Sequence, residues 1–297
     1  MTIIVKLNGG LGNQLFQYAF ARGVSVSTKT NFRLDVTPFH TYYKSDSYEL
    51  SKFNIQEHIA KETDMFGFVW LRKHNTFFNF IYHRLKFNKI LRLWYYMEKT
   101  FMYDQNVFSR KGTTYFDGFW QTEKYFKNIE DDVRKEITLK AALSPQSQKI
   151  QEEIQKTQSV SIHVRRFDTR FDTESKHKPW HSLCSPEYYE RAIEHIVKHV
   201  KSPHFFIFSD NYEWAAETFK TLKYPFTLVG NGKEKNHEDM ILMSQCKNHI
   251  IANSSFSWWG AWLNPRKDKI VVAPQKWFEG APKNDIRDLM PKEWIKL

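Results

Sequence analysis

The chain has 297 residues, which is enough for two domains of ordinary size. Hydrophobic residues make up 41% and charged residues 26%, a composition typical of globular proteins that excludes a disordered chain. The net charge is +11, and the two cysteines, Cys184 and Cys246, are too few for a disulfide framework or a cysteine-based metal cluster.

The N-terminal stretch "MTIIVKLNGG" lacks the basic start and the long apolar run of a signal peptide. No apolar run in the sequence approaches the roughly 20 residues that a membrane span needs. We therefore expect a cytoplasmic protein.

The first half begins with a predicted strand over residues 3–7, a glycine-rich turn, and a helix whose apolar residues recur at helical spacing. A second strand is predicted over 31–36 and helical structure over 60–103. The segment 112–126 is interpreted as a strand, a turn and a helix start, and the polar segment 145–159 as a helix that connects the halves.

Residues 70–103 contain 7 Lys or Arg against one acid, Glu98, and are dense in aromatic residues. The favoured interpretation is a solvated helical face over an aromatic core. The alternative is peripheral association with an anionic membrane, on its inner face, because basic residues opposite Trp and Phe are typical of interfacial helices. Nucleic acid is a third alternative, but no nucleic-acid-binding motif accompanies the charge, and we predict no such partner.

The second half alternates regularly between strands and helices. Strands are predicted over 159–164, 204–210, 225–230, 249–254 and 269–274, and helices over 185–200, 212–222, 237–248 and 255–263. The alternation predicts a doubly wound parallel sheet, with domains over 1–155 and 156–297. Ligands bind beyond the carboxyl ends of the strands in such sheets.

Two arginines follow the first of these strands in "SIHVRRFD" (161–168). Adjacent side chains leave a strand on opposite sides, so one arginine can enter a cleft while the other braces it, and Asp168 can orient a guanidinium. Arginine suits a diphosphate because its planar fork binds two oxygens and keeps its charge. The alternative is a solvated surface pair, Arg165 and Arg166, beside an acid.

The apolar segment "FIFSDN" (206–211) ends in Ser209, Asp210 and Asn211. A carboxylate just past a strand end is placed to bind ribose hydroxyls or a base edge. Taken alone, this segment is better interpreted as an ordinary helix N-cap.

Polar side chains also lie between a strand and a helix in "IIANSSFSWWGAWL" (250–263). These are Asn253, Ser254, Ser255 and Ser257. A helix N-terminus binds anions through its backbone N–H groups and its dipole, and small polar side chains let phosphate oxygens approach. The segment predicts a phosphate site, and we expect its tryptophans to pack in the core.

The segment "NGGLGNQLFQYAFARG" (8–23) lacks the final glycine of a dinucleotide-binding loop. Its glycines permit close approach of another backbone or of a ligand. Asn13 and Gln14 add neutral donors and acceptors at the start of the helix.

Five segments, in order and spanning nearly the whole chain, resemble the α-1,2-fucosyltransferases of glycosyltransferase family 11. They are "GGLGNQLFQYAFARG", "YFDGFWQTEKYF", "HVRRFD", "FSDN" and "EDMILMSQCKNHIIANSSFSWWGAWL". The resemblance implies an α/β, GT-B-like fold with two Rossmann-like domains facing a cleft, of which the N-terminal one holds the acceptor and the C-terminal one GDP-fucose. It also implies inversion at the fucose anomeric carbon with no metal cofactor.

The same resemblance implies roles for individual residues. Arg165 matches the arginine that grips the β-phosphate, His163 and Asp239 match positions that hold guanine, and Gly10 and Asn13 match a loop that faces the sugar. We take Arg165 and Asn13 as the catalytic candidates. The predicted donor-binding residues are Gly10, Asn13, His163, Arg165, Arg166, Asp168, Asp210, Asp239, Asn253, Ser254, Ser255 and Ser257.

Two positions depart from the family pattern. Phe167 stands where the family commonly has glycine, and Asn211 where it commonly has a second acid.

Neither a metal site nor a single catalytic base is indicated. No two aspartates lie two positions apart, so the chain lacks the Asp-x-Asp pair of metal-dependent transferases. An inverting displacement often uses a base on the acceptor hydroxyl. Asp168, Asp172 and His163 are all candidates, and the base stays unassigned.

The resemblance implies the 2-hydroxyl of a terminal galactose as acceptor, in an oligosaccharide or a surface glycan such as an O-antigen. Trp94 and Trp120 offer faces for stacking on a sugar, with core packing as the alternative. Two further hypotheses stay open. One is an enzyme of another linkage or another GDP-sugar, and the other is a non-enzymatic module that binds anionic lipid or nucleic acid through 70–103.

Overall fold

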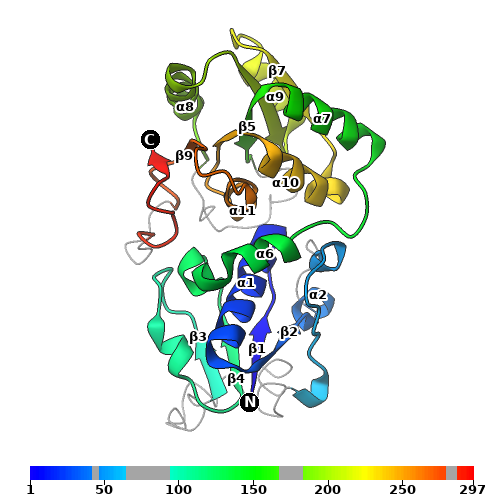
Figure 1. The fold of residues 1–297 in the computed structure, drawn as a ribbon, viewed down its shortest axis with the longest axis vertical. Helices are drawn as coiled ribbons and strands as arrows, with labels where there is room; N and C mark the ends of the chain where they lie inside the picture. The colour runs from blue at the N-terminus through cyan, green and yellow to red at the C-terminus, as the bar shows by residue number, and fades with distance from the viewer. Residues whose placement is uncertain (42–46, 65–93, 167–182, 279–285) are drawn as a thin grey trace. The chain divides into compact units, whose positions relative to one another are not determined.

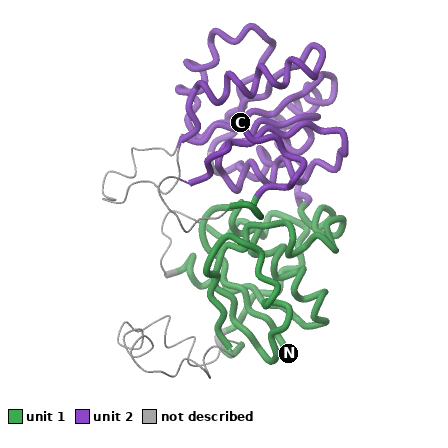
Figure 2. The backbone as a smooth tube through the Cα atoms, turned by 90° about the vertical axis from the view of Figure 1, so that its left-hand side faces the viewer, with its two compact units in different colours: residues 1–137, 285–289 green, residues 138–284, 290–297 purple. Residues whose placement is uncertain are grey.

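The computed structural model describes residues 1–297 except 42–46, 65–93, 167–182 and 279–285. The chain forms two compact units (Figure 2). They are Met1–Ile137 with Asp285–Leu289, and Thr138–Asn284 with Met290–Leu297. Each unit is built on its own parallel sheet.

The first unit contains a four-stranded sheet in the order β2-β1-β4-β3, and all of its strand pairs are parallel (Figure 1). The strands are β1 Thr2–Lys6, β2 Asn31–Asp35, β3 Tyr95–Met97 and β4 Thr114–Asp117. The α-helices are α1 Leu11–Thr28, α2 Thr37–Thr41 and α6 Glu130–Glu136. Single 3-10 turns are η1 Leu50–Lys52, η2 Glu62–Asp64, η3 Gln105–Ser109, η4 Glu123–Tyr125 and η5 Lys127–Ile129.

Helix α1 connects β1 to β2 and is buried over most of its length. The ring of Phe20 stacks on that of Trp120, with 4.2 Å between the ring centroids. One turn later, a Cβ added to Gly23 would stand 2.0 Å from the carbonyl oxygen of Tyr125. The helix therefore packs directly on the backbone of η4 at this point.

The second unit contains a six-stranded sheet in the order β10-β9-β8-β5-β6-β7, again with parallel pairs throughout. The strands are β5 Gln158–Val164, β6 Pro203–Ser209, β7 Phe226–Val229, β8 Asn248–Ile250, β9 Val271–Ala273 and β10 Ile295–Lys296. The helices are α7 Pro145–Lys156, α8 Pro186–His199, α9 Tyr212–Phe219, α10 Asn236–Gln245 and α11 Ser255–Leu263, with the 3-10 turn η7 Lys233–Lys235.

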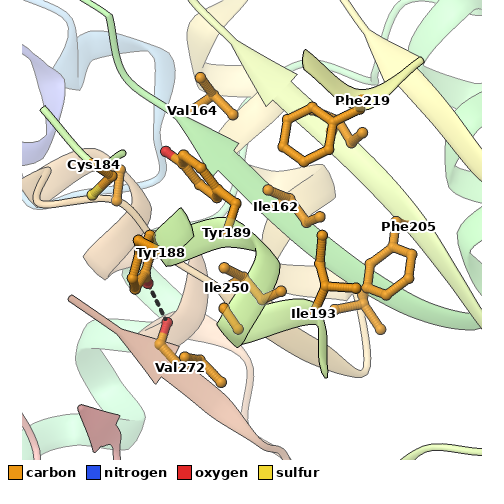
Figure 3. Packing of buried hydrophobic residues seen from close by; sticks show 14 of the residues in the cluster. Ile162, Val164, Cys184, Tyr188, Tyr189, Ile193, Phe205, Phe219, Ile250 and Val272 are labelled. Carbon is orange, nitrogen blue, oxygen red and sulfur yellow. Dashed lines mark hydrogen bonds between the residues drawn. The ribbon is translucent and has the colours of Figure 1, made fainter. Parts of the chain in front are cut away.

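Both faces of this sheet are covered, because successive side chains of a strand point to opposite faces. Ile162 and Val164 of β5 pack with Tyr188 and Tyr189 of α8 and with Phe219 of α9 (Figure 3). On the other face, side chains of β6 pack with α10 and α7. These are Phe206 and Phe208 with Leu242, Met243 and Ile154. Apolar side chains on both faces of a parallel strand explain the continuous apolar runs in the sequence.

The predicted α/β architecture is confirmed, including the doubly wound parallel sheet of the second half. Helix α7 belongs to the second unit, and residues 285–289 belong to the first. Of the predicted helical stretch 60–103, residues 65–93 lie outside the described structure, and 95–97 form strand β3. Tyr95 and Tyr96 are half-buried and aromatic, which suits a strand at the end of the sheet.

Among the helices that the structure describes, none has the length and apolar character needed to cross a membrane.

Gly23→Ala should destabilise the protein by roughly 1–3 kcal/mol net. Alanine favours a helix over glycine by about 1 kcal/mol, but here its methyl group collides with a backbone oxygen that cannot rotate away. The thermal unfolding midpoint measures the effect. Gly10→Ala is the matched control, since a Cβ there meets nothing within 4 Å at an ordinary φ of −69°. Equal midpoints for the two variants would contradict the prediction.

Candidate active site

The candidate site lies at the carboxyl edge of the second unit's sheet, where the strand order reverses. Strand β5 pairs with β6 on one side and with β8 on the other, so the connections that follow β5 and β8 leave in opposite directions. A parallel sheet opens a crevice at such a switch point, because no loop covers it. The residues just after β5, β6 and β8 therefore lie together at this edge, where such sheets bind ligands.

Arg165 and Arg166 follow β5 and are both held by Asp210, which follows β6. The Arg165 guanidinium lies 3.1 Å from Oδ2 of Asp210. The backbone N–H of Arg166 donates to Oδ1 of Asp210 at 2.8 Å, and the Arg166 guanidinium lies over the Trp214 ring at 4.2 Å from its centroid. One carboxylate thus orients the arginine pair, while Arg165 stays 39% exposed.

Asn211 caps helix α9, since its side chain accepts the Trp214 N–H at 2.9 Å. This confirms the N-cap interpretation for that residue. Asp168 and Asp172 lie outside the described residues, so their predicted roles stay predictions.

The serine-rich segment opens helix α11 as predicted, with Ser254 as the N-cap. The Ser254 hydroxyl oxygen accepts the Phe256 N–H at 3.3 Å. Ser257 is instead buried, and its hydroxyl points back toward the carbonyl oxygens of Ala252 and Ser254. Ser254, Ser255 and Phe256 are therefore the partly exposed residues at this helix terminus.

Asn253 is also turned inward. Its Oδ1 accepts from the Cys184 thiol at 3.5 Å, and its Nδ2 donates to the Trp277 carbonyl at 3.2 Å. Both ends of the amide thus support the loop rather than face the crevice. Trp258, Trp259 and Trp262 are at most 2% exposed, so the expected core packing of the tryptophans is confirmed.

His163 connects the arginine segment to the serine segment. Its ring lies 5.4 Å from that of Phe256, in the first turn of α11. Its backbone carbonyl accepts from the Tyr189 hydroxyl at 3.1 Å. The end of β5 and the start of α11 therefore lie side by side. The contact is made by His163, which is two residues before Arg165 in the chain.

The imidazole of His163 is buried, and its Nδ1 has no hydrogen-bond partner among the described contacts. Burial, reinforced by the Arg165 charge, lowers the pKa of His163 to about 3. The ring is therefore neutral near pH 7 and a weak base. It can exchange a hydrogen bond with a ligand, but it is poorly suited to deprotonate an acceptor hydroxyl.

Asp239 lies on the same side of the sheet as His163. Val164 and Ile162 face α8, so His163 faces the side that α10 covers, and Asp239 is in the first turn of α10. Oδ1 of Asp239 accepts from Nδ2 of Asn231 at 2.5 Å. Burial raises the pKa of Asp239 to about 7, against the lowering effect of this hydrogen bond.

A polar network fixes the surroundings of Asp239. Asn231 also donates to Ser147 of α7 at 3.1 Å, and Glu238 accepts from the Ser144 hydroxyl at 2.7 Å. Oδ1 of Asn231 is buried and has no hydrogen-bond partner among the described contacts. Asn231 was not among the predicted site residues. Its place two residues after strand β7 is the signal that could have found it.

The glycine loop of the first unit follows β1 and is fixed by amide side chains. Gly9 has a φ of +71°, which favours glycine, and Gly10 is the N-cap of α1. Oδ1 of Asn13 accepts from Gln121 at 2.8 Å. Nε2 of Gln14 donates to the Gly9 carbonyl at 2.9 Å. Gln121 belongs to the loop after β4, so the two loops are joined at this edge.

The two predicted acceptor tryptophans have different environments. Trp120 is fully buried, stacked on Phe20, and packed against Phe116 and Tyr125. Its ring offers no face to a sugar, so the core alternative is correct for Trp120. Trp94 is 41% exposed and stays a candidate.

The His163 ring should stay neutral across the physiological range. Its carbon-bound proton resonance, identified by its loss in His163→Gln, is expected to stay constant between pH 5 and 8, because the pKa lies near 3. A histidine-containing model peptide, whose imidazole titrates near 6.5, provides the reference in parallel spectra. A His163 midpoint near 6.5 would contradict the burial argument and restore this residue as a candidate base.

Comparisons with known proteins identify the family of the chain. The chain is 35% identical over 302 residues to an alpha-1,2-colitosyltransferase of Escherichia coli, covering 99% of this chain and 98% of that protein. It is 25% identical over 155 residues to the human galactoside alpha-(1,2)-fucosyltransferase 1, covering 49% and 42%. The crystal structure of NodZ alpha-1,6-fucosyltransferase soaked with GDP-fucose shares the fold, with a TM-score of 0.55 at 16% identity, covering 91% and 94%. Residues 2–297 match the family described as "Glycosyl transferase family 11", and the chain belongs to that family.

Proposed function

We propose that this glycosyltransferase moves L-fucose from GDP-fucose to the 2-hydroxyl of a terminal galactose in an oligosaccharide or surface glycan. The observation that carries the proposal is the convergence of two segments at the switch point of the sheet. Arg165 follows β5, and the serine-capped α11 begins beside it. The family 11 match adds the reaction class, and the galactoside-specific human relative supports the acceptor.

Arg165 and the α11 terminus are suited to stabilise the leaving group. Negative charge grows on the β-phosphate as the bond to the sugar breaks, and the sugar becomes oxocarbenium-like. A bidentate arginine and a helix N-terminus both bind phosphate oxygens without a metal ion. By analogy with an oxyanion hole, loss of one such donor costs roughly 10²–10³ in rate.

Asp239 is suited to select guanine. An ionised carboxylate can accept from N1–H and from the exocyclic amine of guanine together, and adenine offers no such pair of donors. Asn231 fixes one carboxylate oxygen, and the neutral His163 ring lies on the same side of the sheet. In the first unit, Gly10 and Asn13 are proposed to face the sugar, and exposed Trp94 to contact the acceptor.

The proposed displacement inverts the anomeric carbon. The glycine loop carries no acid, and the low pKa of His163 disfavours it as the base. Asp168 and Asp172 stay candidates, and a loose transition state needs no strong base.

Colitose is a second candidate for the transferred sugar, because the full-length relative from Escherichia coli is a colitosyltransferase. Colitose is fucose without its 3-hydroxyl. A site that binds this hydroxyl by hydrogen bonds would reject the deoxy sugar by roughly 10⁴-fold, whereas a site that leaves it in solvent would accept both. Discrimination between GDP-fucose and GDP-colitose therefore depends on whether the site forms hydrogen bonds with the 3-hydroxyl.

The test is a thermal-shift panel of GDP, GDP-fucose, GDP-colitose, GDP-mannose and a UDP-sugar, followed by transfer assays and linkage analysis of the product. GDP compounds should stabilise the protein, and fucose should be linked to the 2-position of galactose. Each assay is repeated in EDTA. Stabilisation by the UDP-sugar alone, or activity that EDTA abolishes and Mg²⁺ restores, would contradict the proposal. Transfer of colitose alone would replace the donor assignment.

Arg165→Lys should lower kcat by roughly 10²-fold, and Arg165→Ala by at least as much. Lysine keeps the charge but cannot bind two phosphate oxygens at once. Arg266→Lys is the control, since Arg266 pairs with exposed Asp268 in the same unit. Near-normal turnover in Arg165→Lys would show that a bidentate arginine is not required.

GDP affinity should weaken about tenfold for each pH unit below about 7. The pKa of the free Asp239 carboxyl is about 7, and guanine needs the ionised form, so a proton must leave before binding. Calorimetric titration of GDP between pH 5.5 and 8.5 measures this. The Asp239→Asn variant should bind GDP weakly, and its GDP affinity should depend less on pH. The pH dependence that remains in this variant reports ionisation of the GDP phosphate, which occurs near pH 6. The same steep limb in Asp239→Asn would refute the assignment.

A further inference from the structure

We propose that Glu98 is a positioning residue of the acceptor side: its carboxylate holds the loop Gly118–Gln121 and, through Gln121, orients Asn13. The inference rests on the proposed function for the meaning of Asn13. The contacts themselves are independent of it.

The position of Glu98 follows from the sheet. Its backbone N–H donates to the Asp117 carbonyl at 2.9 Å, which extends the pairing of β3 with β4. Its side chain therefore lies beside the loop that follows β4. A Cβ added to Gly118 would stand 2.4 Å from the Glu98 Cβ, so the loop fits against this side chain only with glycine there.

The carboxylate binds two successive backbone N–H groups of the loop. Phe119 donates to Oε2 at 2.6 Å, and Trp120 donates to Oε1 at 3.0 Å. Trp120 has a φ of +57°, a conformation that costs energy in a bulky residue. Successive N–H groups around a left-handed residue form a concavity that binds anions. Glu98 supplies that anion, which stabilises the unusual backbone of Trp120.

The loop in turn fixes the glycine loop at two points. The Gly118 carbonyl accepts from Gln17 at 3.0 Å, and Oε1 of Gln17 accepts the Asn8 N–H at 3.0 Å. Gln121 donates to Oδ1 of Asn13 at 2.8 Å. A displaced Gly118–Gln121 loop would therefore release both ends of the segment that carries Gly10 and Asn13.

The partly buried Glu98 carboxylate is costly to keep as an anion. Burial raises the pKa of its carboxyl to about 7, and the charge of Asp117 on β4 adds to the effect, while the two N–H groups lower it. Asp117 is itself paired with Lys6 of β1 at 3.2 Å. The Glu98 charge also helps to raise the pKa of the Tyr125 hydroxyl in η4. Protonation of Glu98 turns one carboxylate oxygen into an O–H group, which is a poor acceptor for the Phe119 or Trp120 N–H. The Gly118–Gln121 loop should therefore loosen as the pH falls through 7.

The first test is amide hydrogen exchange of residues 118–121 between pH 5.5 and 8.5, corrected for intrinsic rates. In the wild type, protection should fall at least tenfold toward low pH with a midpoint near 7. In Glu98→Gln, protection should be low at every pH. Glu136→Gln is the matched control, because Glu136 is a partly buried acid of the same unit that binds Arg22 and Tyr18. Protection that is independent of pH in the wild type, or lost equally in Glu136→Gln, would overturn the proposal.

The second test is kinetic, with the donor saturating so that Asp239 titration does not contribute. The kcat/KM for the acceptor should fall tenfold for each pH unit below 7 in the wild type, and this limb should be absent in Glu98→Gln. GDP affinity should change less than twofold in that variant. A limb that persists in Glu98→Gln would overturn the proposal.

Coupling from Glu98 to Asn13 through the Gly118–Gln121 loop is tested with Gln121→Ala and with the double variant that combines Glu98→Gln and Gln121→Ala. Non-additive effects on acceptor kcat/KM support transmission from Glu98 to Asn13, and additive effects contradict it. If no acceptor is fucosylated at all, the proposed function fails, while the exchange experiment still decides the role of Glu98.

Discussion

The structure of the candidate site depends on one constraint: strand β5 pairs in parallel with both β6 and β8. Parallel pairing brings the carboxyl ends of all three strands to one edge. Separate chain segments therefore deliver Arg165, Asp210 and the α11 terminus to the same place. The hydrogen bonds of Asp210 and the contact between His163 and Phe256 then fix these segments relative to one another.

Much of the second unit was predictable, because buried parallel strands appear as short apolar runs and their helices carry clear caps. The ends of those runs also predicted which segments lie together at the carboxyl edge of the sheet. Orientation at single residues was not predictable. Ser257 and Asn253 lie in the right segment, yet both bind within the protein, since a turn can direct neighbouring side chains to opposite sides. The burial of Trp120, which was a candidate for stacking on a sugar, was also not predictable, because burial depends on partners that are distant in sequence.

Glu98 shows a different limit. In the sequence it is a single acid in a basic, aromatic stretch, and nothing nearby indicates a partner. Its partners are backbone N–H groups about 20 residues away, brought close by the pairing of β3 with β4. Asp239 and Glu98 both have a pKa near 7 through burial, one in each unit. Patterns of residue type do not reveal such shifts, because burial is a property of the folded chain.

The ion pair between Arg165 and Asp210 has a further consequence. A free arginine side chain carries about 2 kcal/mol of rotamer entropy, which a ligand would otherwise have to remove on binding. Here folding already restricts the guanidinium, because Asp210 holds it while leaving it partly open to solvent. If Arg165 binds a diphosphate as proposed, this restriction lowers the entropic cost of binding, and Asp210 pairs with the guanidinium again after the ligand departs.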